Sequence, residues 1–220
     1  HRSSKPMTIE YKDSIEMVTS ADLEADRFIC SEIARRFPNH RILSEESAPE
    51  LEDSRAICEP LWIIDPIDGT VNYAYRHYQV AVSIAYAEGG AVHAGAVHCP
   101  SLDETFNAAK GKGAWLNGKE ISASSPIDLK SSLIATGFPY DKSMVFPLVT
   151  KLHKVLEHCR DIRRTGSAAL DICWVAVGRL DGFYENLKPW DQAAASLIAT
   201  EAGAGRGRWR PSTSNLPDDI

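Results

Sequence analysis

Two aspartates that follow a short apolar run are the first candidates for chemistry in this sequence. Residues 62–64 have the pattern of a buried strand, and Asp65, Pro66 and Asp68 lie within the four residues that follow. Because proline has no N–H to give to a neighbouring strand, we expect the sheet pairing to end at Pro66. The two carboxylates would then lie on a turn at the carboxyl end of a strand, where open α/β sheets bind their ligands. They repel each other unless a cation lies between them, although Asp, Pro and Gly are also the usual residues of an ordinary polar turn.

Acidic residues elsewhere in the chain stand at similar boundaries. Glu45 follows a short expected strand, and Asp22 and Asp191 each lie in the first turn of an expected helix. Considered singly, Glu45 is a surface residue and Asp191 is a helix cap, because aspartate is a favoured capping residue. Considered with Asp65 and Asp68, they offer the carboxylate oxygens that Mg²⁺ prefers over imidazole or thiolate. The set therefore predicts a magnesium site assembled from distant parts of the chain.

An anion site is expected beside this acid cluster. Gly166, Ser167 and Ala168 begin an expected helix, where the first N–H groups have no helical partner and can bind an anion. The alternative is an ordinary helix capped by Ser167. Gly69 lets the backbone approach a ligand closely, and Thr70 adds a hydroxyl group. A metal cluster next to an anion site indicates the chemistry of phosphate esters.

The composition argues against several classes of protein. The chain has 220 residues, of which 44% are hydrophobic and 25% are charged, and this fits a single globular unit with a sizeable core. A net charge of −6 argues against a general nucleic-acid-binding surface, so no nucleic-acid partner is expected. The five cysteines have no paired short spacing and indicate free thiols in a reducing compartment. Neither a membrane-spanning run nor a signal peptide is visible, so we expect a cytoplasmic location and no membrane partner.

Other candidate motifs are weaker. The sequence contains no nucleophile elbow, Walker loop or dinucleotide glycine pattern. His93 and His98 are five residues apart on an expected strand, where they would face opposite sides, so we interpret them as packing or surface residues. The run Gly-Lys-Gly at 111–113 lacks the spacing of a phosphate loop and is interpreted as a turn.

Hydrophobic periodicity and turn signals predict the elements that position these residues. A hairpin is expected where residues 80–86 and 91–97 flank Gly89-Gly90, and its small apolar residues predict strands covered by helices on both sides. Residues 1–17 and 48–60 are polar and are expected to be loops. The other expected elements are helices at 20–37, 145–159, 167–177 and 190–203, and strands at 41–43, 62–64, 104–108, 114–116, 132–136 and 181–185.

Several motifs, in this order along the chain, resemble those of the inositol monophosphatase family. They are Val-Thr-Ser-Ala-Asp at 18–22, Ser-Glu-Glu-Ser at 44–47, Asp-Pro-Ile-Asp-Gly-Thr at 65–70 with Asn72, the glycine-rich run 111–118, Gly-Ser-Ala-Ala at 166–169, and Trp-Asp-Gln-Ala-Ala at 190–194 continued by 201–203. The resemblance covers about residues 18–203. It implies a layered α/β sandwich of the sugar-phosphatase type, with αβαβα architecture, that requires Mg²⁺, is sensitive to Li⁺ and forms a homodimer.

The resemblance also implies a domain organisation. We expect one catalytic domain over residues 1–220 with two packed lobes, at about 1–125 and 126–220. The helix that precedes the Val-Thr motif in the family has no counterpart in this sequence, and the end of the chain from Arg206 departs from the family's closing strands.

Each residue that matches a family motif has an implied role. The ligands of up to three Mg²⁺ ions would be Glu45, Asp65, the carbonyl group of Ile67, Asp68 and Asp191. Glu45 and Thr70, with Asp22 behind Thr70, would position and deprotonate the attacking water. The N–H groups of Gly69 and Thr70 would face the phosphate. The substrate as a whole would be contacted by Glu45, Ile67, Asp68, Gly69, Thr70, Gly166, Ser167, Ala168, Glu185 and Asp191. Glu185 is one residue closer to Asp191 than is usual in the family.

The expected function is a Mg²⁺-dependent hydrolysis of small polyol monophosphates, with inositol monophosphate as the substrate and a metal-activated water as the nucleophile. Fructose-1,6-bisphosphatase and 3′,5′-bisphosphate nucleotidase activities are alternatives on the same fold, but Asn72, in place of a Lys-Glu run, favours the inositol type. An alternative of another class is a non-catalytic homologue that binds metal or phosphate. The presence of Glu45, Thr70 and Asp22 argues against it, because binding alone needs no activated water.

Overall fold

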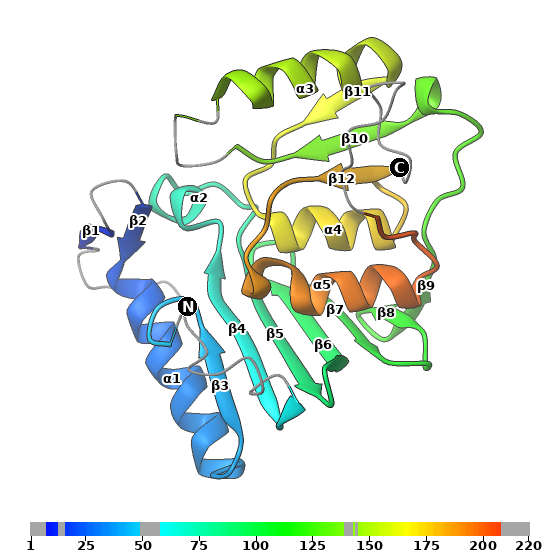
Figure 1. Cartoon of the computed structure of the whole chain (residues 1–220). Coiled ribbons are helices and arrows are strands. Elements are labelled where there is room, and N and C mark those ends of the chain that lie inside the picture. The colour runs from blue at the N-terminus through cyan, green and yellow to red at the C-terminus, as the bar shows by residue number, and fades with distance from the viewer. Residues whose placement is uncertain (1–7, 13–15, 49–57, 139–142, 144, 208–220) are drawn as a thin grey trace.

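A large and a small β-sheet with helices between them form the framework of the protein (Figure 1). The computed structural model describes residues 8–12, 16–48, 58–138, 143 and 145–207. The layers confirm the expected α/β class and αβαβα architecture. Helices α4 (Ala168–Ala176) and α5 (Pro189–Glu201) lie between the sheets, α3 (Val145–His158) covers the outside of the small sheet, and α1 (Ser20–Arg36) packs on the large one.

In the described part of the chain, the large sheet contains seven strands in the order β3-β4-β5-β6-β7-β8-β9. The pair β3–β4 is parallel, and the other pairs are antiparallel. In the small sheet, β10 lies between β11 and β12 and is parallel to both. The strands are β3 (Arg41–Ser44), β4 (Leu61–Asp68), β5 (Ala81–Glu88), β6 (Ala91–Cys99), β7 (Glu104–Ala109), β8 (Ala114–Leu116), β9 (Lys119–Ile121), β10 (Leu133–Thr136), β11 (Asp161–Arg163) and β12 (Gly182–Tyr184).

The polar residues 1–17, expected to be a loop, contain two short strands instead. β1 (Ile9–Lys12) pairs antiparallel with β2 (Glu16–Thr19). The prediction was wrong because strands of four residues are too short to show a clear alternation of polar and apolar side chains. Residues 1–7 and 13–15 lie outside the described residues, as do residues 49–57 of the second expected loop.

Strand β4 continues past Pro66, so the expected end of sheet pairing at this residue is wrong. Asp65 and Asp68 both pair with β5, and the register shifts between them. The shift creates a position at which Pro66 needs no N–H for the ladder. The N–H of Ile67 donates to Oδ1 of Asp65 at 3.0 Å instead. As predicted, both aspartates lie at the carboxyl end of a buried strand.

The hairpin expected around Gly89-Gly90 is confirmed. Strands β5 and β6 pair on either side of it, and the two glycines have positive φ angles of 59° and 78°. Helix α5 packs closely on the inner face, because a Cβ atom at Gly95 would lie 2.8 Å from the Cα atom of Ala194. This contact leaves no room for a side chain at position 95 and holds α5 close to the sheet.

The outer face of the same hairpin differs from the prediction. The prediction that helices cover both faces of this hairpin is wrong, because among the described elements α1 packs mainly on β4. The outer side chain of Tyr86 is half-buried, and it lies against the rings of Trp62 and His93, with centroid separations of 5.3 and 6.5 Å. Aromatic contacts across the strands therefore shield this face in place of a second helix.

The main hydrophobic core lies between the large sheet and the helices α4 and α5. Leu61, Phe106, Leu170 and Ile198 are among its fully buried side chains. Burial of these residues fixes both helices with their first turns close to the end of β4. Within the described ranges, no helix has both the length and the apolar composition that crossing a membrane requires.

Candidate active site

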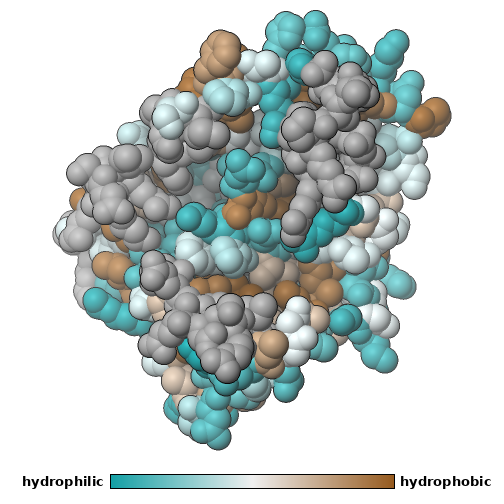
Figure 2. Space-filling view, viewed as in Figure 1, coloured by the Kyte–Doolittle hydropathy of each residue, from teal (hydrophilic) through white to brown (hydrophobic). Residues whose placement is uncertain are grey.

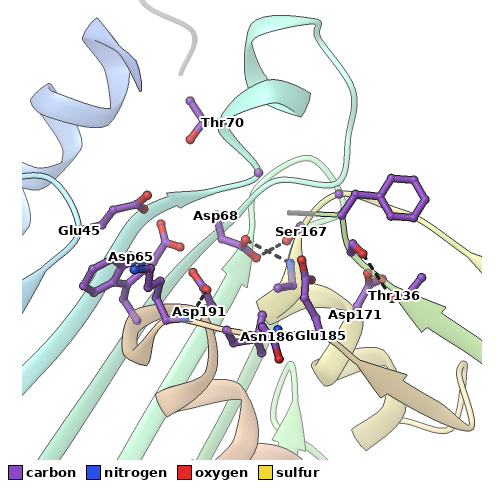
Figure 3. Close-up of a pocket in the computed structure, with 18 of the residues that line it drawn as sticks. Glu45, Asp65, Asp68, Thr70, Thr136, Ser167, Asp171, Glu185, Asn186 and Asp191 are labelled. Carbon is purple, nitrogen blue, oxygen red and sulfur yellow. Dashed lines mark hydrogen bonds between the residues drawn. The ribbon is translucent and has the colours of Figure 1, made fainter. Parts of the chain in front are cut away.

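A pocket of about 360 Å³ opens where β4 ends, and both halves of the chain line it. Its walls come from the end of β3, the junction of β4 with α2 (Thr70–Ala74), the start of α4, the residues after β10 and the segment from β12 to α5. Hydrophilic residues gather around a hollow in the visible face of the molecule (Figure 2). Acidic side chains surround the pocket (Figure 3), and its lining includes Glu45, Asp65, Asp68, Asp171, Glu185 and Asp191.

Asp65 and Asp68 are buried carboxylates with further acids around them. They are only 2% and 7% exposed. Burial raises the pKa of Asp65 well above its usual value, and the negative charges of Glu45, Asp68 and Asp191 raise it further. Burial also raises the pKa of Asp68, although the hydrogen bonds that it accepts oppose this rise. The cluster is electrostatically unfavourable by itself, and a cation at its centre would reverse the sign of these interactions.

Asp68 binds the N-terminal end of α4. Its Oδ2 atom accepts hydrogen bonds from the Ser167 hydroxyl at 2.5 Å and from the N–H of Ala169 at 2.8 Å. Its Oδ1 atom accepts a bond from the N–H of Ala168 at 3.1 Å. The expectation of a free N–H group is therefore wrong for Ala168, because Asp68 itself supplies the negative charge at the helix start. Gly166, Ser167 and Ala168 nevertheless line the pocket.

The hydroxyl of Thr70 and the carboxylate of Asp22 meet although they are 48 positions apart in the chain. Oγ1 of Thr70 lies 3.0 Å from Oδ1 of Asp22 and 3.2 Å from the carbonyl oxygen of Ile67, and it can donate to either. Asp22 is held by Thr19, the N-cap of α1, whose N–H donates to Oδ2 at 2.8 Å and whose hydroxyl also bonds to it. Both Thr70 and Asp22 are buried. The structure thus brings together the pair that the resemblance predicts.

The turn before Thr70 requires glycine. Gly69 has a φ of 94°, in the left-handed region. A Cβ atom there would lie 2.9 Å from the carbonyl oxygen of Gln79 and 3.0 Å from that of Gly166. The absence of a side chain therefore lets the end of β4 lie against the segment before α4, and this contact closes one side of the pocket.

Glu45 and Asp191 complete the acidic side of the pocket. Asp191 lies in the first turn of α5, where its Oδ2 accepts a hydrogen bond from the N–H of Lys188 at 2.7 Å, so it caps the helix and lines the pocket at once. Glu45 follows β3, and its N–H donates to the carbonyl oxygen of Ile64 at 3.3 Å. Among the described residues, the structure contains no preformed group of three His, Cys, Asp or Glu side chains around a metal position. The role of these acids as metal ligands stays a prediction.

The other side of the pocket carries two acids of a different kind. Figure 3 shows Glu45 and Asp65 on one side and Glu185 and Asp171 on the other. Burial raises the pKa of Glu185 to about 7, and the charge of Asp191 adds to the rise. Burial likewise raises the pKa of Asp171 to about 7. Burial therefore favours the protonated form of both carboxyl groups more than water does.

Sequence reasoning missed Asp171, Arg164 and Asn186, which also line the pocket. Oδ1 of Asp171 accepts a hydrogen bond from the Thr165 hydroxyl at 2.6 Å. The positive charge of Arg164 lowers the pKa of Asp171 against the effect of burial. One signal could have found Asp171: it is an acidic residue in the first turn of α4, next to the glycine and serine that were already assigned to the site.

The weaker motifs lie outside the pocket lining. His93 and His98 hydrogen bond to neighbouring strand residues at 3.0 and 2.9 Å, as expected for packing or surface histidines. The N–H groups of Gly111, Lys112 and Gly113 donate to the carboxylate of Glu201 at 2.7, 3.0 and 2.9 Å. This segment is therefore a turn, as predicted, and not a phosphate loop. All five cysteines are free thiols.

Known proteins resemble this chain in sequence and in fold. Residues 1–216 match the model of the inositol monophosphatase family. The chain is 42% identical over 194 residues to Nus factor SuhB of Escherichia coli K12, which covers 87% of this chain and 72% of that protein. It is 40% identical over 205 residues to the inositol monophosphatase of Dictyostelium discoideum, which covers 91% and 75%. Its fold matches the crystal structure of the extragenic suppressor protein SuhB from Bartonella henselae with a TM-score of 0.81, at 36% identity over 90% of this chain and 75% of the other. This chain therefore belongs to the inositol monophosphatase family.

Proposed function

We propose that this chain is a Mg²⁺-dependent phosphatase of small polyol monophosphates and that inositol monophosphate is its substrate. The observation that carries the proposal is the buried acid cluster, in which Glu45, Asp68 and Asp191 all raise the pKa of Asp65. Their carboxylates and the carbonyl oxygen of Ile67 are hard donors, which suit a hard divalent cation. Members of this family generally depend on a metal, and this supports the choice.

The acidic side of the pocket would hold up to three Mg²⁺ ions through Glu45, Asp65, Asp68, Asp191 and the carbonyl group of Ile67. Asp65 and Asp191 each use one carboxylate oxygen to accept a backbone N–H, which limits the rotation of the carboxylate. Bound at this cluster, Mg²⁺ would lower the pKa of a water molecule and neutralise the phosphate oxygens. The ligands come from three different elements, so the fold must be complete before the site can form.

Asp22 would orient the Thr70 hydroxyl for the attack by water. When Oδ1 of Asp22 accepts the Thr70 proton, a lone pair of Thr70 Oγ1 can accept a hydrogen bond from the water. The carboxylate of Glu45, on the acidic side of the same pocket, would accept the other water proton and act as the base. Water would attack phosphorus directly while the bond between phosphorus and the alcohol oxygen breaks, and the departing alcohol would take a proton from a solvent water molecule. No covalent intermediate with the enzyme is then needed.

The alcohol part of the substrate would contact Gly166, Ser167, Ala168 and Glu185, while the N–H groups of Gly69 and Thr70 would face the phosphate. The Ser167 hydroxyl donates its proton to Asp68, so its oxygen is left as an acceptor. Hydroxyl groups of a polyol can donate to this oxygen and to the Glu185 carboxylate. A phosphate ester whose alcohol part has no further hydroxyl group can make neither hydrogen bond, and this favours a polyol as the substrate.

The proposal extends to the organisation of the protein, with family membership as its main support. We propose one catalytic domain with two lobes, a homodimer, sensitivity to Li⁺ and a cytoplasmic location. A net charge of −6 supports the absence of a nucleic-acid partner. The Escherichia coli relative is named a Nus factor, and this name favours a non-catalytic role as the second candidate function.

A panel of substrates separates these candidates. Phosphate release is measured from inositol 1-phosphate, fructose 1,6-bisphosphate, a 3′,5′-bisphosphonucleotide and histidinol phosphate, each with and without Mg²⁺. We expect inositol 1-phosphate to give the highest kcat/KM. Preference for the bisphosphates would assign one of the alternative activities. No release from any substrate, with metal binding retained, would favour the non-catalytic role.

A further inference from the structure

The carboxylate of Glu185 lies directly against the backbone of Gly137. A Cβ atom built on Gly137 would lie 1.9 Å from Oε2 of Glu185 and 2.1 Å from its Cδ and Oε1 atoms. Cβ atoms in proteins essentially never approach other heavy atoms to less than 3.0 Å. Any side chain at position 137 would therefore force the carboxylate to move by more than 1 Å, which is the difference between 1.9 and 3.0 Å.

The pairing of β10 with β12 brings the two residues together. The strands are parallel, with Thr136 opposite Tyr184, and Gly137 and Glu185 are the next residue along each chain. The Thr136 hydroxyl donates to the carbonyl oxygen of Tyr184 at 2.8 Å, which ties the two strand ends together. The contact is thus a consequence of the sheet register.

The backbone at Gly137 does not itself require glycine. Its φ lies outside the left-handed region that only glycine adopts readily, so alanine can take the same conformation. The atoms in the way belong to the end of a flexible side chain, which can turn aside without moving the core. A Cβ atom at this position would consequently change the place of the carboxylate far more than the fold.

We propose, resting on the proposed function, that Gly137 is a positioning residue that lets Glu185 lie back against β10 and so makes room in the pocket for a polyol ring. Both residues line the pocket, as do Phe138 and Arg164, whose guanidinium carbon lies 5.3 Å from the centre of the phenyl ring. A carboxylate displaced from Gly137 enters the pocket on its alcohol side and no longer meets the ring hydroxyl groups. Glu45 and Asp65 of the acid cluster lie on the other side of the pocket (Figure 3).

Kinetics of Gly137→Ala with a large and a small substrate test this inference. We expect KM for inositol 1-phosphate to rise roughly tenfold, because a hydrogen bond to a charged group is lost. Glycerol 2-phosphate is too small to need the space that Glu185 leaves open in the pocket when it lies against Gly137. For this substrate, kcat of Gly137→Ala should therefore stay within about twofold of wild type. Gly205→Ala is the matched control, because Gly205 is exposed and has no atom within 4 Å of its added Cβ.

A double-mutant cycle separates a positioning role from a purely structural one. In a Glu185→Ala background, where no carboxylate is in the way, Gly137→Ala should cause no further rise in KM. The proposal is overturned if Gly137→Ala alone leaves KM unchanged, or if it raises KM equally in both backgrounds. A wild-type protein that hydrolyses neither substrate would overturn the proposed function and this inference together, whereas an active wild type confines a failure to Gly137.

Discussion

Asp65→Asn should change stability and metal binding in opposite directions, because Asp65 stands at the centre of the acid cluster. Asparagine keeps a side-chain oxygen that can accept the N–H of Ile67, which bonds to Asp65 at 3.0 Å, and it has nearly the same size. The substitution removes a buried charge that burial, Glu45, Asp68 and Asp191 all disfavour. Without metal the variant should therefore be more stable than wild type, and with Mg²⁺ it should lack a ligand.

The sign of the stability change follows from the raised pKa of Asp65 in the folded protein. The carboxyl group contributes stability below its ordinary pKa of 3.8, and this contribution is lost as the pH rises through the raised value. At pH 8, far above the ordinary pKa of the group, burying this carboxyl group costs on the order of 1–3 kcal/mol. Since each kcal/mol shifts Tm by about 2–4 °C in a chain of this size, a rise of several degrees is expected in EDTA.

In excess Mg²⁺ we expect wild type to be more stable than Asp65→Asn, which reverses the order expected in EDTA. A ligand at 100 times its Kd stabilises a protein by about 2.7 kcal/mol, and loss of one carboxylate from the site should remove most of that gain. Thermal unfolding at pH 8, in EDTA and in excess Mg²⁺, measures both effects. Asp103→Asn, at an exposed position, changes the net charge equally and serves as the control. A lower Tm of Asp65→Asn in EDTA, or a Mg²⁺ shift equal to that of wild type, would refute the reasoning.

Substitutions at two further residues probe the rest of the pocket. Thr70→Val removes the hydroxyl that bonds to Asp22 and should lower kcat about 10²–10⁴-fold at saturating Mg²⁺. Thr70→Ser keeps a hydroxyl group and should retain most activity. Equal activity of the two variants would contradict the role of the hydroxyl. Asp171→Asn keeps an acceptor for Thr165, and it removes a carboxyl group whose pKa rises from 3.8 to about 7 in the folded protein. The stability that the Asp171 carboxyl group contributes at low pH is lost as the pH rises through about 7. Without metal, Asp171→Asn should therefore be more stable than wild type at pH 8.5, by at most ~4 kcal/mol. This gain in stability should vanish towards pH 4. Urea unfolding measures the free energy of unfolding of both proteins. A gain for Asp171→Asn that does not depend on pH would argue against a buried charge at Asp171.

The parts of the fold that the sequence predicts well are those with strong local signals. Gly89-Gly90 marks its hairpin because both positions have positive φ, and the apolar residues at helical spacing in 20–37 and 145–159 predict α1 and α3. Pro66 was misjudged because its lack of an N–H was taken as the end of the strand, whereas the partner strand shifts register around it. Local propensity contains no information about such a compensation in a neighbouring strand.

In the candidate site, too, local signals predict some of the residues but not the contacts between distant parts of the chain. Asp65, Asp68 and Asp191 follow from acids at element boundaries, but the bond between Thr70 and Asp22 joins residues 48 positions apart and depends on how α1 docks against β4. Family motifs supplied that pair, and spacing alone could not. The contact between Gly137 and Glu185 depends in turn on the parallel register of β10 and β12, which no local pattern specifies.

Release of inorganic phosphate from inositol 1-phosphate, measured as a function of Mg²⁺ concentration after full removal of divalent ions, tests the central claim most directly. A site built from Glu45, Asp65, Asp68 and Asp191 predicts no turnover in EDTA and a saturable rise as Mg²⁺ is added. Turnover of inositol 1-phosphate in EDTA at the rate seen with Mg²⁺ would contradict it.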